Sequence, residues 1–95
     1  MNKELSNEKF IRFFRALGNE ERIQILKLLR ESKELCAQEV EKNFYLEQST
    51  TSHHLNTLRR AGIVNIRKSG RNIFYSLNLE NLKANWLEFE RFFNN

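Results

Sequence analysis

The stretch from Gln48 to Gly62 constrains the fold most, because its two faces differ sharply in chemistry at helical spacing. At 3.6 residues per turn, Thr51, Leu55 and Leu58 fall on one apolar face. The opposite face has no acid and carries small polar, imidazole and cationic side chains: Ser49, Ser52, His53, Asn56 and Arg60. Gly62 ends the helix, as expected of a left-handed C′ residue. Short donors and acceptors followed by an arginine suit base edges and phosphates, so we interpret this stretch as a DNA recognition helix.

The positive charge of the chain is concentrated in and just after this stretch. Residues 1–47 contain nine Lys or Arg and nine Glu, and residues 73–95 carry a net charge of −1. Residues 48–72 contain no acid and five cations, namely Arg59, Arg60, Arg67, Lys68 and Arg71. This window therefore carries +5, against +4 for the whole chain, which is the footprint expected of a protein that binds a polyanion.

Three helical patterns precede the candidate recognition helix. Leu5–Leu17 carries an aromatic stripe, with Ser6 as the expected N-cap, and Asn19 caps a second helix that is rich in Ile and Leu. Leu35–Phe44 is predicted to be a short third helix, and residues 43–47 form the turn before Gln48. Two helices joined by a short turn, the second polar and basic on its outer face, are typical of a helix-turn-helix.

The segment from Ile63 to Leu77 has the two-residue period of strands. Between its two alternating halves, Lys68–Asn72 has the composition of a hairpin tip, where Gly70 can adopt a positive φ.

Leu79–Phe93 is then a final helix. The order predicts a mostly α fold with a small β-hairpin, a winged helix-turn-helix, over one domain spanning residues 1–95. Lys68 and Arg71 at the tip of the wing would reach phosphates or the minor groove.

The first and last helices carry more aromatic surface than the core of one small domain needs. The residues concerned are Phe10, Phe13, Phe14, Trp86, Phe89 and Phe93. Because exposed apolar patches usually mark a partner surface, we expect a homodimer that pairs through its N- and C-terminal helices. Two-fold symmetry would place the recognition helices about 34 Å apart, one turn of DNA. A pocket between these aromatic rings for an organic inducer is an alternative use of the same surface.

Several blocks of the chain match one known pattern: Gln48–Leu55, Leu58, Ala61–Val64, Arg67, Gly70–Arg71 and Tyr75–Leu77, with Leu17–Ile23 and Glu34–Cys36 upstream. In these residues the chain resembles the ArsR/SmtB family of small bacterial winged-helix repressors. The resemblance implies a homodimer that binds an imperfect inverted repeat and usually leaves it when an inducer binds. It also implies a reading role in the major groove for Gln48, Ser49, Ser52 and His53, and a basic wing formed by Arg67, Lys68 and Arg71.

His53 and His54 are neighbours, so on a helix they point about 100° apart and do not chelate one ion comfortably. In one interpretation, one ring faces solvent and the other is partly packed against the third helix. In the other, His53 donates to a base or phosphate and His54 supports the helix from behind. The polar residues on the same face as His53, namely Ser49, Ser52 and Asn56, favour the second interpretation.

Cys36 is the only cysteine. Near a helix start, where the dipole favours a thiolate, it is a possible redox sensor; the alternative is a small, partly buried residue with no sensing role. One thiol per chain cannot supply a soft-metal site. Metal-sensing members of the family have a second cysteine at the position of Gln38, and the last helix lacks the His used by another family site. We therefore expect no metal and no cofactor, and a non-metal or thiol-based signal rather than a metal.

Other functional classes fit the sequence poorly. It has no membrane-length apolar run and no signal peptide, so a cytoplasmic protein with no membrane partner is expected. It has no paired carboxylates or phosphate loop, and Cys36 has no identifiable base, so we predict no enzyme. The prediction is a sequence-specific transcriptional regulator that acts as a homodimeric repressor on an inverted repeat of double-stranded DNA. The alternative is a winged-helix module used for protein or RNA contacts.

Overall fold

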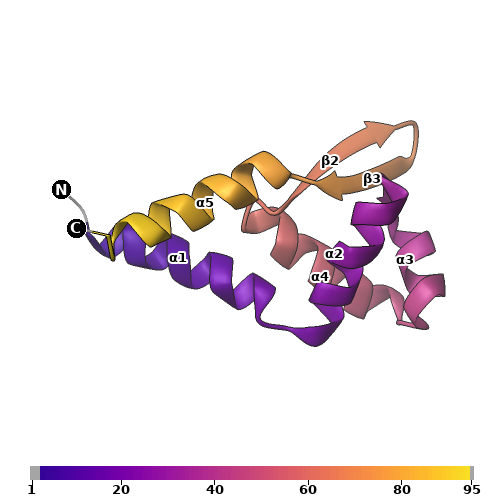
Figure 1. Ribbon diagram of the computed structural model, residues 1–95. Helices are drawn as coiled ribbons and strands as arrows, with labels where there is room; N and C mark the ends of the chain where they lie inside the picture. Colours follow the sequence, from indigo (N-terminus) through magenta and orange to yellow (C-terminus); the bar gives the residue numbers. More distant parts are fainter. Residues whose placement is uncertain (1–2, 95) are drawn as a thin grey trace.

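The computed structural model describes residues 3–94. Its elements are α1 (Lys3–Leu17), α2 (Glu20–Ser32), β1 (Leu35–Cys36), α3 (Ala37–Phe44), α4 (Gln48–Arg60), β2 (Val64–Ser69), β3 (Asn72–Leu77) and α5 (Leu79–Arg91) (Figure 1). The molecule is elongated, with extents of 45 × 23 × 22 Å. Helices α1 and α5 lie side by side at one end, and α2, α3, α4 and the hairpin form the other end (Figure 1). The mostly helical fold with a small hairpin is confirmed.

Local sequence explains where the helices begin. The Asn19 side chain accepts a hydrogen bond from the Arg22 N–H at 3.0 Å, and the Asn78 side chain accepts one from the Asn81 N–H at 3.1 Å. The predicted N-cap Asn19 is therefore confirmed, and Asn78 caps α5 in the same way. The prediction for Ser6 was wrong, because α1 already begins at Lys3 and Ser6 lies inside the helix.

The end of α4 depends on a glycine. Gly62 has a φ of +74°, a left-handed conformation in which its N–H bonds to the Arg59 carbonyl at 2.9 Å. The Asn81 side chain of α5 donates to the Gly62 carbonyl at 2.7 Å, and a Cβ at Gly62 would collide with the same amide nitrogen. Gly62 thus ends α4 and lets α5 approach it.

The third helix is shorter than the sequence predicts. Leu35 and Cys36 form strand β1, which pairs antiparallel with β3 in a sheet of order β1-β3-β2. The extended backbone supplies hydrogen bonds along the free edge of β3 while the Leu35 side chain enters the core. Helix α3 then starts at Ala37, and the Glu39 carboxylate accepts a hydrogen bond from the Cys36 N–H at 2.9 Å. That bond lowers the pKa of the Glu39 carboxyl below its ordinary value.

The core lies between α1, α2, α3, α4 and the base of the hairpin. Its buried residues are Phe13, Ala16, Ile25, Leu29, Leu35, Val40, Leu55, Leu58, Ile63 and Val64. Thr51, Leu55 and Leu58 are all fully buried, which confirms the predicted inner face of α4. Among residues 3–94, no helix combines the length and the hydropathy that crossing a membrane requires.

Two of the aromatic residues assigned to a dimer contact are already covered within the chain. Phe13 is only 2% exposed and belongs to the core. Phe10 is buried by Phe89 and Phe92, whose rings meet it edge-on with centroids 5.4 Å away in both cases. Because α2, α4 and α5 already cover Phe10 and Phe13 within the chain, the dimer contact proposed below does not include them.

Candidate nucleic-acid interface

The outer face of α4 is polar, free of acids and open to solvent. The predicted reading residues fall within about 140° of arc at 100° per residue, and all are exposed except Asn56, which is half-buried: Gln48, Ser49, Ser52, His53, Asn56 and Arg60. Arg59 is also exposed, falls inside this arc about 20° from Gln48, and was not assigned from the sequence. We call these seven residues the reading face.

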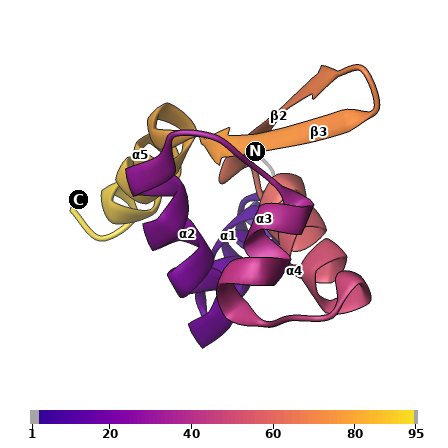
Figure 2. The same ribbon diagram turned by 90° about the vertical axis from the view of Figure 1, so that its right-hand side faces the viewer.

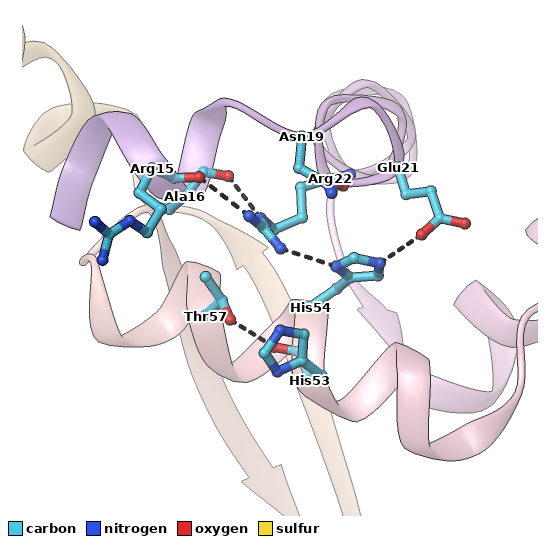
Figure 3. A network of polar contacts seen from close by, with 8 residues as sticks. All are labelled: Arg15, Ala16, Asn19, Glu21, Arg22, His53, His54 and Thr57. Atoms are coloured by element: carbon cyan, nitrogen blue, oxygen red, sulfur yellow. Dashed lines mark hydrogen bonds and ion pairs between the residues drawn. The ribbon is translucent and has the colours of Figure 1, made fainter. Parts of the chain in front are cut away.

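The two histidines of α4 point in different directions. His53 is exposed on the reading face, whereas His54 is only 4% exposed and faces α2. Figure 3 shows the His54 ring between Arg22 and Glu21, with His53 outside that contact. This arrangement leaves the His53 imidazole free to donate to a ligand and makes His54 part of the support of the helix.

The hairpin projects from the helices as a wing (Figure 2), and Arg71 of the wing lines one hollow with Gln48 and Ser52 of the reading face. Strands β2 and β3 pair from Val64↔Leu77 to Ser69↔Asn72, and Gly70 turns the chain with a φ of +61°. The predicted tip is therefore confirmed. Lys68 and Arg71 are both exposed near this tip, so the wing presents two cations to solvent.

The Arg67 side chain is exposed but is paired with Glu34. Its guanidinium donates two hydrogen bonds to the Glu34 carboxylate, at 2.9 and 2.8 Å, and lies 4.7 Å from the centroid of the Phe74 ring. The hydrogen bonds from Arg67 lower the pKa of the Glu34 carboxyl, so the pair is intact at neutral pH and is lost only as the pH falls through the lowered carboxyl pKa. A phosphate would have to compete with Glu34 for this side chain.

Cys36 borders the reading face. It lines a hollow of about 400 Å³ between α3, α4 and the wing, together with Gln48, Ser52 and Arg71. The thiol is half-buried, and its sulfur lies 3.7 Å from Gln38 Oε1. In the part of the chain that the structure describes, no three His, Cys, Asp or Glu side chains gather as metal ligands would.

Sequence reasoning missed Arg22, a buried cation of α2. It is 7% exposed and contacts both His54 of α4 and the last carbonyls of α1 (Figure 3). The sequence held a signal for it, because Arg22 falls on the same helical stripe as Ile25 and Leu29. A cation on an apolar stripe indicates a paired, buried side chain rather than a solvated one.

The paired terminal helices expose a second surface, which is apolar. On α5, Trp86 is 49% exposed and Phe93, just beyond the helix, is 72% exposed. Phe14 and Phe89 are half-buried beneath them, with ring centroids 4.6 Å apart. We call this the terminal-helix surface; its other exposed members are Ile11 and Phe92.

A helix-turn-helix whose second helix has an acid-free outer face, followed by a cationic hairpin, defines the class of winged-helix DNA-binding proteins. Comparison with known proteins narrows the class. The family model described as "Bacterial regulatory protein, arsR family" matches residues 19–65. An uncharacterized HTH-type transcriptional regulator of Methanocaldococcus jannaschii is 44% identical over 68 residues, which cover 72% of this chain and 76% of the relative.

Transcriptional activator HlyU of Vibrio cholerae is 40% identical over 81 residues, covering 85% of this chain and 74% of HlyU. A solved structure of HlyU has a TM-score of 0.71 at 36% identity and covers 97% and 99% of the two chains. The homodimeric winged helix-turn-helix DNA-binding domain of a possible ArsR-family regulator from Mycobacterium bovis has a TM-score of 0.78 at 25% identity, covering 94% and 82%. The chain belongs to the ArsR family and is a DNA-binding transcriptional regulator.

Proposed function

We propose that this regulator is a homodimeric repressor, without catalytic activity, that binds an inverted repeat and leaves it in response to a signal. The residues proposed to read bases are Gln48, Ser49, Ser52, His53 and Asn56, with Arg60 on the adjacent phosphates. Occupation of a promoter by such a dimer would exclude polymerase. Because DNA is its partner, we place the protein in the cytoplasm.

One observation carries the DNA assignment: the reading face has no acid, and Arg71, an exposed cation of the wing, lines the same hollow as Gln48 and Ser52 of that face. A carboxylate on that face would repel phosphates, and its absence over 13 helical residues distinguishes α4 from an ordinary solvated helix. A surface for protein partners would instead favour exposed aromatic and apolar side chains. On this chain such side chains gather on the terminal-helix surface.

Replacing Ser52 or His53 by alanine is expected to relax specificity at one position of each half-site. Removing a hydrogen bond to a base edge would cost about 1–3 kcal/mol of discrimination, since that edge is left without its partner. The measurement is fluorescence anisotropy with a duplex selected from a random DNA pool and with a scrambled duplex of the same length. If both variants distinguish the two duplexes as well as wild type does, α4 does not read the bases.

The same selection tests the alternative role. Enrichment of a palindrome from the DNA pool is expected. If no DNA sequence is enriched while the protein captures an RNA or a protein partner through α4, the winged helix serves that other partner instead.

Arg71→Ala is expected to weaken binding to all DNA sequences, and Arg67→Ala to change it little. Arg71 is exposed near the wing tip, and its removal should reduce the slope of log affinity against log salt by about 1. Arg67 is paired with Glu34, so we propose that Lys68 and Arg71, rather than Arg67, make the phosphate contacts of the wing. An equal reduction of the slope in both variants would show that DNA displaces Glu34 from Arg67.

The proposed dimer contact is the terminal-helix surface, reduced to Phe14, Trp86, Phe89 and Phe93 together with Ile11 and its exposed neighbours. Half-exposed large aromatic rings at one end of an elongated molecule are typical of an oligomer contact. Pairing there would leave both reading faces open at the opposite end.

Cys36 is proposed as the thiol that receives the signal, because a modified sulfur would intrude on the hollow beside Gln48 and Ser52. Hydrogen peroxide, which converts an accessible thiol to a sulfenic acid, is then expected to release wild-type protein from its operator. Cys36→Ser should bind the operator equally with and without peroxide. Release of both proteins would place the oxidised group elsewhere, and release of neither would remove Cys36 from the proposal.

A further inference from the structure

A chain of hydrogen bonds connects α1, α2 and α4 beneath the reading face (Figure 3). Arg22 Nη1 lies 3.1 Å from His54 Nδ1, and His54 Nε2 lies 2.7 Å from Glu21 Oε1. In the other direction, Arg22 Nε donates to the Ala16 carbonyl at 2.7 Å and Nη2 donates to the Arg15 carbonyl at 3.1 Å. One buried guanidinium therefore joins the last turn of α1 to the middle of α4.

These contacts determine the protonation of His54. A guanidinium can only donate, so His54 Nδ1 must accept from Arg22 and carries no proton. The proton is then on Nε2, which donates to the Glu21 carboxylate. Turning the ring over would place a C–H group against Arg22 and leave the guanidinium without its partner. The ring is therefore held in one orientation and one neutral tautomer.

The same contacts satisfy groups that are costly to bury unpaired. The last carbonyls of a helix lack partners within the helix, and the negative end of the helix dipole favours a cation. Arg22 fulfils both needs at the end of α1, and each of its three guanidinium nitrogens has an acceptor. If His54 were removed, one nitrogen of the buried Arg22 guanidinium would lose its acceptor. Leaving a buried charged donor unpaired costs free energy.

We propose that Arg22 and His54 are positioning residues that fix the rotation of α4 about its axis relative to α1. The proposal rests on the proposed DNA-reading function. His54 directly follows His53 and lies two residues from Ser52, so its fixed ring sets the directions in which both side chains leave the helix. Through Arg22, the His54 ring also connects α4, the proposed reading helix, with α1, which bears Phe14 of the proposed dimer contact.

Small rotations matter at this site. With side chains, a helix is about 10–12 Å wide, so turning it by about 10° moves a side-chain tip by about 1 Å. Hydrogen bonds to bases tolerate a range of only about 0.5 Å in length. Nonspecific attraction to phosphates falls slowly with distance and survives such a shift. Disrupting the positioning residues should therefore reduce specific binding much more than binding to random DNA.

The test compares His54→Leu, which removes both hydrogen bonds of the ring, with His54→Gln, whose amide offers one acceptor and one donor. Arg22→Lys disrupts the same series of hydrogen bonds from the α2 side, since an ammonium cannot reproduce the planar fork of the guanidinium. Leu58→Val serves as the stability control, because Leu58 is fully buried on α4 and is not in the chain of hydrogen bonds. Urea unfolding identifies conditions in which every variant is folded.

Under those conditions, His54→Leu and Arg22→Lys are expected to lose about ten- to a hundredfold in affinity for the selected operator. Affinity for a scrambled duplex should change less than about threefold, and His54→Gln should regain most of the operator affinity. Leu58→Val should keep the ratio of the two affinities. If His54→Leu keeps that ratio, or if Leu58→Val loses it equally, Arg22 and His54 contribute only stability and the proposal is wrong.

A second measurement does not depend on DNA. Nitrogen-15 NMR of the imidazoles is expected to show His54 as the Nε2–H tautomer at neutral pH, and a proton on Nδ1 would contradict the assigned hydrogen bond. If wild type itself enriches no DNA sequence, the proposed function fails and the positioning role fails with it. If wild type discriminates and the His54 variants discriminate equally well, only the positioning role fails.

Discussion

Replacing Trp86 by aspartate is expected to yield a folded monomer that binds its operator poorly. Trp86 is 49% exposed on α5, and its ring stands 6.5 Å from that of Phe14 and 6.1 Å from that of Phe89. In the monomer an aspartate there remains in water, whereas in the dimer its carboxylate would lose water without gaining a partner. Sedimentation velocity measures the assembly directly.

The decrease in DNA binding should be large because two linked half-sites bind far more tightly than one. Separating the protomers is expected to reduce operator affinity by about 10²–10⁴-fold. Ala84→Asp is the matched control, since Ala84 is exposed on the same helix, about 160° away around its axis, and its substitution introduces the same charge. Trp86→Asp protein that stays dimeric, or dissociation of the Ala84→Asp variant, would refute the terminal-helix surface as the dimer contact.

Gly62→Ala is expected to cause the largest decrease in stability from a single added methyl group. The backbone φ of +74° disfavours any L side chain by about 1–2 kcal/mol. The new Cβ would also displace the Asn81 amide and break its bond to the Gly62 carbonyl, for a total of about 2–4 kcal/mol. Urea unfolding followed by circular dichroism gives the free energy of unfolding.

Gly70→Ala separates the backbone cost of a positive φ from the cost of the lost hydrogen bond. Gly70 also has a positive φ, of +61°, but no atom lies within 4 Å of where its Cβ would be. Its substitution should therefore cost only the backbone term, about 1–2 kcal/mol. Equal decreases at the two glycines would mean that the hydrogen bond between α5 and the end of α4 contributes nothing to stability.

The parts of this molecule that were predictable from the sequence are those with a local chemical cause. Asn19 and Asn78 cap their helices through bonds to residues three positions away, and Gly70 turns a hairpin between two alternating segments. The inner face of α4 follows from a single helical period. Local patterns of this kind require no knowledge of distant partners, so the order of the helices and the wing could be predicted.

The parts that were missed depend on contacts between distant segments. Leu35 and Cys36 fit a helix start as well as a strand, and only their pairing with Tyr75 and Phe74 decides between them. Arg67 has its carboxylate partner 33 residues away in sequence, at Glu34. Phe13 and Phe14 are adjacent aromatic residues, yet Phe13 enters the core and Phe14 lies nearer the surface because of how α1 packs. No periodicity contains that information.

Two attachments between α2–α4, the DNA-reading part of the fold, and the terminal helices α1 and α5 use main-chain carbonyls as hydrogen-bond acceptors. Arg22 binds carbonyl oxygens of Arg15 and Ala16, and Asn81 binds the carbonyl oxygen of Gly62. A carbonyl is the same in every residue, so the side chains of α1 can diverge without breaking either attachment. Gene duplicates of such a regulator could therefore acquire mutually exclusive pairing partners while their operator preference stays unchanged.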